Sequence, residues 1–184
     1  MIRLRIDPRS LEQAPCFVAI STFAEEDLPL RGLPGKIDKL LEGEASRQIA
    51  MGNLSGDWES QALLASRGRV GPKFVLFAGL GSLRKVTRSA LSVRIEEIVQ
   101  RVLKVSAQDL ALDVFRSSSA EGEYENLASE TVRGVLRGAA QFPYDVTVTI
   151  CEPEPGRFHE LAAVAEKTAF RHVEGRELSV EIIL

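Results

Sequence analysis

Residues 28–81 read LPLRGLPGKIDKLLEGEASRQIAMGNLSGDWESQALLASRGRVGPKFVLFAGLG, and this stretch decides the fold. Its first part places apolar residues on one helical stripe, namely Leu33, Ile37, Leu40, Leu41 and Ala45. This spacing predicts an amphipathic helix that ends near Gly52. Residues 61–65 predict a short strand. The uninterrupted apolar run at residues 74–78, FVLFA, predicts a strand that is covered on both faces.

The same alternation of strands and helices continues on both sides of this stretch. Strands are expected at residues 3–6, 16–20, 109–115, 145–151 and 178–184. Helices are expected from a start between residues 82 and 87, at 125–140, and around residues 158–169. This order predicts an α/β fold of three layers, α/β/α, around a mixed, mostly parallel sheet. No linker interrupts the pattern, so one domain is expected over residues 1–184.

Residues 145–151 alternate apolar with polar side chains. Val146 and Val148 are separated by Thr147, and Thr149 follows. The alternation predicts a strand with one exposed face, and we place it near a sheet edge.

Composition narrows the classes of function. The chain has 23 Lys and Arg against 26 Asp and Glu, a net charge of −3, which argues against a general nucleic-acid binder. No apolar run approaches the length of a membrane span, and the amino terminus lacks the apolar core of a secretion signal. A cytoplasmic protein that does not contact membranes is therefore expected. The two cysteines, Cys16 and Cys151, predict buried thiols rather than a disulfide framework.

Several sequence features in order carry a family resemblance. Residues 29–32 (PLRG) precede the first helix, which contains the pair Ile37 and Asp38, and Gly52 marks its end. FVLFAGLG at residues 74–81 and VRGVLRGAAQF at residues 132–142 follow. This set resembles the amino-terminal domain of the leucyl (cytosol) aminopeptidases, although Leu54 stands where that family usually has Phe. The resemblance extends from about Cys16 to Ala169 and implies a macro-like α/β/α domain.

The resemblance also implies what the chain does not do by itself. The two-metal catalytic domain of that family lies downstream, and its Asn-Thr-Asp-Ala-Glu-Gly-Arg signature has no counterpart here. We therefore expect no catalytic residue, metal ligand or cofactor, and no enzymatic activity of this chain alone. The function expected is that of a non-catalytic binding or interaction domain. One alternative is a regulatory or oligomerisation part, or a fragment, of a leucyl aminopeptidase; another is a macro-type module that binds ADP-ribose or a nucleotide. An autonomous enzyme is a further alternative.

These readings imply different partners. The interaction readings imply a homo-oligomer or a separate peptidase subunit, and the macro-type reading implies a nucleotide-like ligand. The strand-like tail at residues 178–184 suggests a chain that ends as a self-contained domain, and a truncated piece of a longer enzyme is the alternative.

Glycine-containing turns are the candidate ligand sites. Gly79, Gly81 and Ser82 leave the buried strand 74–78, where backbone N–H groups at the start of a helix can bind an anion. A tight turn that needs glycine for its geometry explains the same residues. Gly32 and Gly35 occupy the early position at which macro-type ADP-ribose binders approach their ligand, but the Asn-Ala-Asn run of those binders is missing.

Other single features have ordinary structural explanations. Ser117, Ser118 and Ser119 lack the Gly-x-Ser-x-Gly context of a nucleophile and are expected in a loop. His159 and His172 have no Cys or His partners at zinc-site spacing. Trp58, the single tryptophan, is expected either to anchor a contact between subunits or to pack on its own domain.

Overall fold

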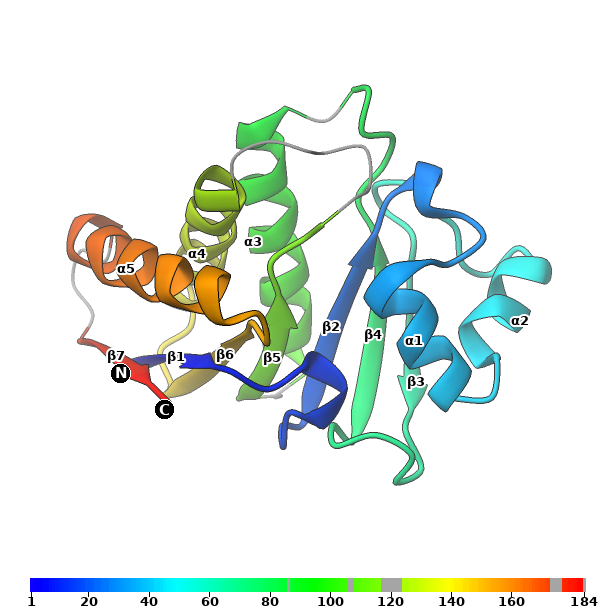
Figure 1. The fold of residues 1–184 in the computed structure, drawn as a ribbon, viewed down its shortest axis with the longest axis horizontal. Helices are drawn as coiled ribbons and strands as arrows, with labels where there is room; N and C mark the ends of the chain where they lie inside the picture. Colours follow the sequence, from blue (N-terminus) through cyan, green and yellow to red (C-terminus); the bar gives the residue numbers. More distant parts are fainter. Residues whose placement is uncertain (86, 106–107, 117–123, 173–176, 184) are drawn as a thin grey trace.

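The computed structural model describes all residues except 86, 106–107, 117–123, 173–176 and 184. Its centre is a seven-stranded sheet with the order β3-β4-β2-β5-β6-β1-β7 (Figure 1). The strands are β1 (Ile2–Asp7), β2 (Val18–Phe23), β3 (Gln61–Ala65), β4 (Phe74–Gly79), β5 (Asp109–Asp113), β6 (Val146–Cys151) and β7 (Leu178–Ile182). β3 runs antiparallel to β4, and the other pairings are parallel. The expected α/β fold with a mixed, mostly parallel sheet is confirmed.

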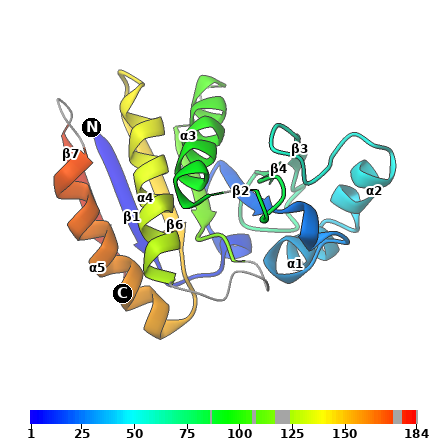
Figure 2. The ribbon, with the colours of Figure 1, turned by 90° about the horizontal axis from the view of Figure 1, so that it is seen from above.

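Helices lie on both faces of the sheet. They are α1 (Gly32–Leu40), α2 (Glu44–Ala50), α3 (Arg88–Lys104), α4 (Tyr124–Ala140) and α5 (Pro155–His172), with short 3₁₀ turns η1 (Leu11–Gln13) and η2 (Glu25–Asp27). α3, α4 and α5 cover one face, while α1 and α2 lie on the other (Figure 2). No helix in the described ranges is long and apolar enough to cross a membrane.

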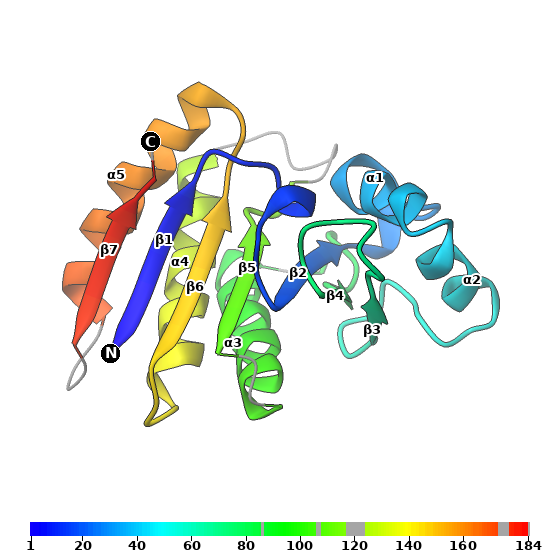
Figure 3. The same ribbon diagram turned by 90° about the horizontal axis from the view of Figure 1, so that it is seen from below.

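The two faces are covered to different extents. In β4, Leu76 packs toward α3–α5, whereas Val75 and Phe77 pack into the cluster beneath α1 and α2. Apart from Cys151 at the end of β6, the buried apolar residues of β6, β1 and β7 pack against α3–α5, and Figure 3 shows the opposite face of these strands with no helix in front of it. The sheet is therefore part of three layers at β2 and β4 but of two layers at β6, β1 and β7.

This unequal coverage corrects the prediction for residues 145–151. β6 does not lie near an edge, because it pairs with β5 on one side and β1 on the other. Its apolar residues Val146, Val148 and Ile150 are buried beneath the helices, and Thr147, which alternates with them along the strand, lies on the opposite face and is partly exposed. The alternation of apolar and polar residues therefore indicates that one face of the strand is uncovered. It does not indicate where the strand lies in the sheet.

The single helix predicted from Leu33 to near Gly52 is two helices, α1 and α2. The chain turns at Glu42 and Gly43, which have φ angles of 60° and 74°. The buried carboxylate of Asp38 accepts hydrogen bonds from the backbone N–H groups of Ala45 and Ser46 and from the Ser46 hydroxyl. Asp38 thus caps α2 from within α1, and this stabilises the break.

The cysteines are buried and unbridged, as predicted. β2 begins at Val18, two residues later than expected. Cys16 lies in the turn before the strand, where its N–H donates to the Ala14 carbonyl. Burial raises the pKa of Cys16 to about 12 and also raises the pKa of Cys151. Both thiols therefore remain uncharged at neutral pH.

Candidate functional site

A cleft lies at the carboxyl ends of β2 and β5. The chain leaves β2 toward α1 on one face of the sheet, and it leaves β5 toward α4 on the other face (Figure 2). Connections that diverge in this way from neighbouring parallel strands leave a crevice, which is the usual ligand site of open α/β sheets. The cleft has a volume of about 490 Å³, a size suited to a small-molecule ligand.

Residues from four strand ends and from α1 line this cleft. They are Ser10, Leu11, Thr22, Asp27, Arg31, Gly32, Leu33, Pro34, Lys36, Asp113, Arg116, Cys151 and Pro153. Arg31, Lys36 and Arg116 supply positive charge, and Asp27 and Asp113 supply carboxylates. The lining is therefore mixed in charge and suits a ligand with both anionic and hydrogen-bonding groups.

The start of α1 opens onto the cleft. Gly32 begins the helix with a φ of +58°, and the first helical hydrogen bond runs from the N–H of Gly35 to the carbonyl of Arg31. The N–H groups of Gly32 and Leu33 precede that bond, so they are donors at the positive end of the helix dipole. Arg31 is exposed and forms no ion pair with any residue that the structure describes.

The other two cations are held by buried carboxylates. Lys36 pairs with Glu12, whose side chain is only 6% exposed and also accepts a hydrogen bond from Ser10. Burial by itself raises the pKa of Glu12, but the hydrogen bonds from Lys36 and Ser10 outweigh it and lower the pKa overall. The ammonium group of Lys36 is thereby fixed at the side of the cleft.

Glu152 holds the third cation. It follows β6, is fully buried, and its Oε1 lies 3.1 Å from the Arg116 guanidinium. Its Oε2 accepts a hydrogen bond of 2.6 Å from the Tyr124 hydroxyl, and burial together with this bond raises the pKa of Tyr124. The network joins the ends of β5 and β6 to the start of α4, and so positions Arg116.

Asp113 is the acid with the most perturbed ionisation in the cleft. Burial raises its pKa to about 7, although Arg116 opposes the shift. The neighbouring carboxylates Glu152 and Glu12 raise the pKa of Asp113 further. Asp113 therefore changes charge near neutral pH, and the net charge of the cleft changes with it.

The predicted glycine sites fall in two places. Gly32 lines the cleft, and Gly35 lies in the next turn of α1, where an added Cβ would stand 2.6 Å from the Leu30 carbonyl oxygen. Gly35 is thus needed for the close packing of α1 on its own loop. Both residues lie near the start of α1, and binding of a ligand by Gly32 or Gly35 stays a prediction.

Gly79, Gly81 and Ser82 lie on the other side of η2. Glu26 of η2 accepts a hydrogen bond from the Ser82 hydroxyl, whereas Asp27 lines the cleft. The N–H of Gly79 donates to the Ser60 carbonyl and that of Gly81 to the Gly56 carbonyl. The turn therefore binds residues of the loop after α2, and anion binding there stays a prediction.

Sequence reasoning missed most of the cleft. Asp113, Arg116 and Cys151 were not singled out as site residues, although each lies at or just after the end of a predicted strand. The carboxyl ends of parallel strands lie side by side at one end of the sheet. A polar residue at the end of a predicted strand was therefore the sequence feature that could have indicated the cleft. Ser117–Ser119 lie outside the described residues. Trp58 packs on its own domain, with the Arg94 guanidinium 5.7 Å from its ring centre.

The described residues contain no group of three or more His, Cys, Asp or Glu side chains that could hold a metal ion.

Comparison with known proteins now identifies the family. The model described as "Cytosol aminopeptidase family, N-terminal domain" matches residues 18–143. The chain belongs to this family. No curated protein sequence matches this cytosol aminopeptidase N-terminal domain.

Solved structures show which fold this N-terminal domain shares. A Trypanosoma brucei macrodomain in complex with ADP has a TM-score of 0.68 at 11% identity, over 90% of this chain and 67% of that one. A mutant Oceanobacillus iheyensis macrodomain with ADPR has a TM-score of 0.65 at 10% identity, over 91% of each chain. The macrodomain of Thermus aquaticus DarG has a TM-score of 0.61 at 11% identity, over 83% of this chain and 100% of that one. The expected macro-like fold is confirmed.

Proposed function

We propose that this chain is a non-catalytic binding domain whose cleft takes a small phosphate-bearing ligand of the ADP-ribose class. The observation that carries the proposal is the cleft between β2 and β5, with Arg31 and the start of α1 on one side and Arg116 on the other. Phosphate groups bind well where helix N–H donors and arginine side chains converge.

The charges of the cleft favour an anion with further polar groups. Lys36 and Arg116 are paired with Glu12 and Glu152, whereas Arg31 forms no ion pair with a described residue and is available to bind a ligand. Asp113 adds a group that donates a hydrogen bond when protonated and accepts when ionised. In such a ligand the phosphate can pair with Arg31, and the ribose hydroxyl can donate a hydrogen bond to Asp113 or accept one from it.

The structural neighbours support this ligand class. One macrodomain of this fold is described in complex with ADP and another with ADPR. The identities of 10–11% establish the fold alone, so the ligand class is carried by the chemistry of the cleft together with the shared architecture.

Calorimetric titration tests the proposal. ADP-ribose, ADP and inorganic phosphate are titrated into the native chain and into two charge-reversed variants. Arg31→Glu is expected to weaken ADP-ribose binding roughly tenfold or more. Lys39 lies near the other end of α1, is exposed and is outside the cleft, so Lys39→Glu is the matched control and is expected to bind as the native chain does.

Two results would reject this ligand. One is the absence of heat with all three compounds, together with no rise in melting temperature, because a ligand that binds only the folded state must stabilise it. The other is equal loss of binding in Arg31→Glu and Lys39→Glu, which would indicate a general charge effect. Turnover of leucyl substrates with manganese or zinc well above the blank would overturn the non-catalytic assignment.

A second candidate is an assembly role within an aminopeptidase, as a regulatory or oligomerisation domain. The uncovered face of β6, β1 and β7 favours it, because parallel strands are usually covered on both faces (Figure 3). Light scattering of the chain with a separate catalytic subunit tests it, and independent elution of the two proteins would count against it.

A further inference from the structure

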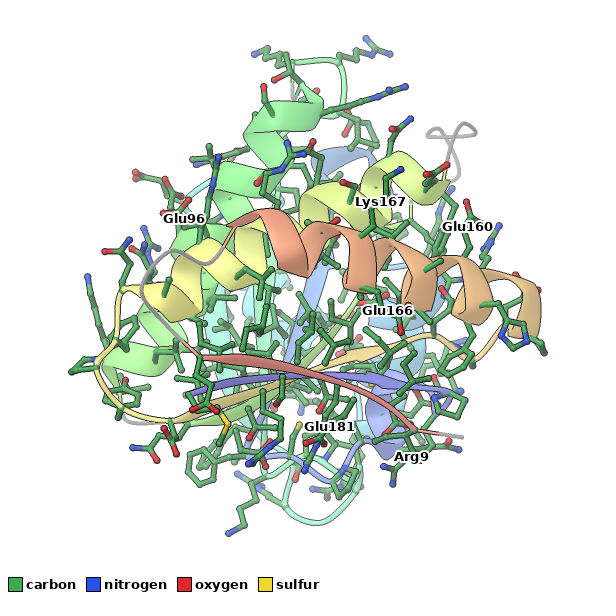
Figure 4. The ribbon with its side chains drawn as sticks, turned by 90° about the vertical axis from the view of Figure 1, so that its left-hand side faces the viewer. Arg9, Glu96, Glu160, Glu166, Lys167 and Glu181 are labelled. Atoms are coloured by element: carbon green, nitrogen blue, oxygen red, sulfur yellow. The ribbon has the colours of Figure 1, made fainter. Side chains whose placement is uncertain are left out.

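β7 forms one end of the sheet and presents an open edge. It pairs with β1 on its inner side, and no described strand pairs with its outer side. Figure 4 looks onto this part of the molecule, with β7 in front, α5 on one side and Glu181 on the other. The outer edge therefore offers backbone groups to a further strand.

The hydrogen bonds to β1 identify these outward groups. The N–H of Ile2 donates to the Glu177 carbonyl at 2.8 Å, and the N–H of Ile183 donates to the Ile6 carbonyl at 2.9 Å. In a parallel ladder the same parity of residues faces one neighbour throughout. Odd-numbered residues of β7 therefore bond to β1, and Leu178, Val180 and Ile182 direct their N–H and C=O groups outward.

This edge lacks the usual protection against pairing. Strand edges are commonly guarded by lysine, proline or a bulge, and residues 178–182, LSVEI, contain none of these. The only charge, Glu181, is held on the uncovered face of the sheet, with its oxygens 3.1 Å from Arg3 Nε and 2.8 Å from Arg5 Nε. Ile182 is 37% exposed at the same edge.

We infer that two copies of this chain associate by antiparallel pairing of their β7 strands around a two-fold axis at Val180. This register places Val180 opposite its own counterpart and Leu178 opposite the partner's Ile182. All three residues direct their backbone groups outward, so each can exchange hydrogen bonds with the residue that it faces. A two-fold interface of this kind is self-complementary, as isologous dimers require.

Side chains on the uncovered face also match in this register. Ser179 lies opposite the partner's Glu181. The Ser179 hydroxyl is buried and has no hydrogen-bond partner in the structure, and a buried polar group without a partner is destabilising. If the Ser179 side chain turns toward the partner, its hydroxyl can donate to the partner's Glu181, whose oxygens also bind Arg3 and Arg5. On the opposite face, the exposed Ile182 would be covered by the partner's Leu178.

β3, at the other edge of the sheet, is less complementary to the β3 strand of a second copy. Pairing of two β3 strands around Leu63 would place Gln61 opposite the partner's Ala65. The buried Gln61 Oε1, which also has no partner, would gain no donor from that alanine side chain. We therefore assign the association to β7, and it is independent of the ligand cleft.

Cysteine cross-linking tests the register. In Val180→Cys the two new cysteines face each other with Cα atoms about 5.5 Å apart, a distance that a disulfide can bridge. In Ile182→Cys they are about 13 Å apart along the antiparallel pair, beyond the reach of a disulfide. Leu63→Cys is the control at the other edge. The native Cys16 and Cys151 are buried and do not interfere.

Mild oxidation followed by non-reducing electrophoresis should give a covalent dimer with Val180→Cys and monomers with the other two variants. Sedimentation of the native chain should show a concentration-dependent dimer, and Ile182→Lys should raise its dissociation constant roughly tenfold by adding an edge charge. Ile182 is exposed, so this variant folds even if Val180→Cys does not.

Three results would overturn the inference. The first is a native chain that sediments as a monomer at every concentration. The second is a dimer that Ile182→Lys leaves unchanged. The third is cross-linking of Leu63→Cys, or of Ile182→Cys as completely as Val180→Cys. Binding of ADP-ribose to Ile182→Lys should equal that of the native chain, so failure of the pairing and failure of the proposed ligand function are told apart.

Discussion

The β2–β4 half of the sheet and the β6–β1–β7 half differ in how many faces the helices cover. Phe77 of β4 lies beneath α1 and α2, while its neighbour Leu76 faces α3–α5. In β1, by contrast, Leu4 is buried but Arg3 and Arg5 lie on the face without a helix. A continuous apolar strand therefore indicates two covered faces, and an alternating strand indicates one. The cleft lies where the coverage changes.

The largest expected effect is in the half that is covered twice. Phe77→Ala should lower the free energy of unfolding by about 3–5 kcal/mol, because it removes a fully buried ring and leaves a cavity. Arg5→Ala on the uncovered face should lower it by less than about 1 kcal/mol. Urea unfolding followed by fluorescence measures both.

A milder change keeps this comparison testable if Phe77→Ala does not fold. Phe77→Leu retains an apolar side chain and should lose about 1–2 kcal/mol. Equal losses for Phe77→Leu and Arg5→Ala would contradict the difference in coverage between the two halves.

The second effect compares two carboxylates that bind arginine. Glu152→Gln should lower the free energy of unfolding by about 1–3 kcal/mol, because Glu152 is fully buried and bound by Arg116 and Tyr124. Glu181→Gln should lower it by less than about 1 kcal/mol, since Glu181 is 42% exposed. Thermal unfolding at low protein concentration, where β7 pairing is absent, measures both. A larger loss with Glu181→Gln would be the contrary result.

The third effect concerns the pH dependence of stability at the cleft. The pKa of Asp113 is about 7 in the folded chain, above its ordinary value of 3.8. Between these values the folded state retains a proton that the unfolded state has lost. Asp113 should therefore reduce the free energy of unfolding progressively as the pH rises from about 4 to about 7, and the reduction should persist above that.

Asp113→Asn isolates this contribution. The variant lacks the ionisation, so its stability relative to the native chain should increase between pH 4 and pH 7 and then level off. Asp7 provides the contrast. Burial alone raises its pKa, but the bonds from Arg9 lower it overall, so its stabilisation is lost only in more acidic solution. Parallel pH profiles for Asp113→Asn and the native chain would disprove the assignment.

The sequence predicted the strands and the layers, because these depend on local patterns. Gly32 was singled out from its place before the first helix, and it lines the cleft, but ligand binding there stays a prediction. The sequence did not predict that Asp113, Arg116 and Cys151 line one cleft. These residues follow different strands, and the order of the strands in the sheet depends on tertiary packing and not on local patterns. The break after α1 was missed for the same reason, since Asp38 caps Ala45 and Ser46 across a turn.

The smallest expected effect tests the uncovered face directly. Thr147→Val should change the free energy of unfolding by no more than about 0.5 kcal/mol, because Thr147 lies on that face and the two side chains have the same shape. The neighbouring Val148→Thr should lose about 1–3 kcal/mol, since Val148 is fully buried and its new hydroxyl would lie among apolar side chains. Urea unfolding of both variants separates the two faces of one strand. A loss with Thr147→Val as large as that with Val148→Thr would mean that the face is covered after all, and the covering segment would then have to come from a second molecule.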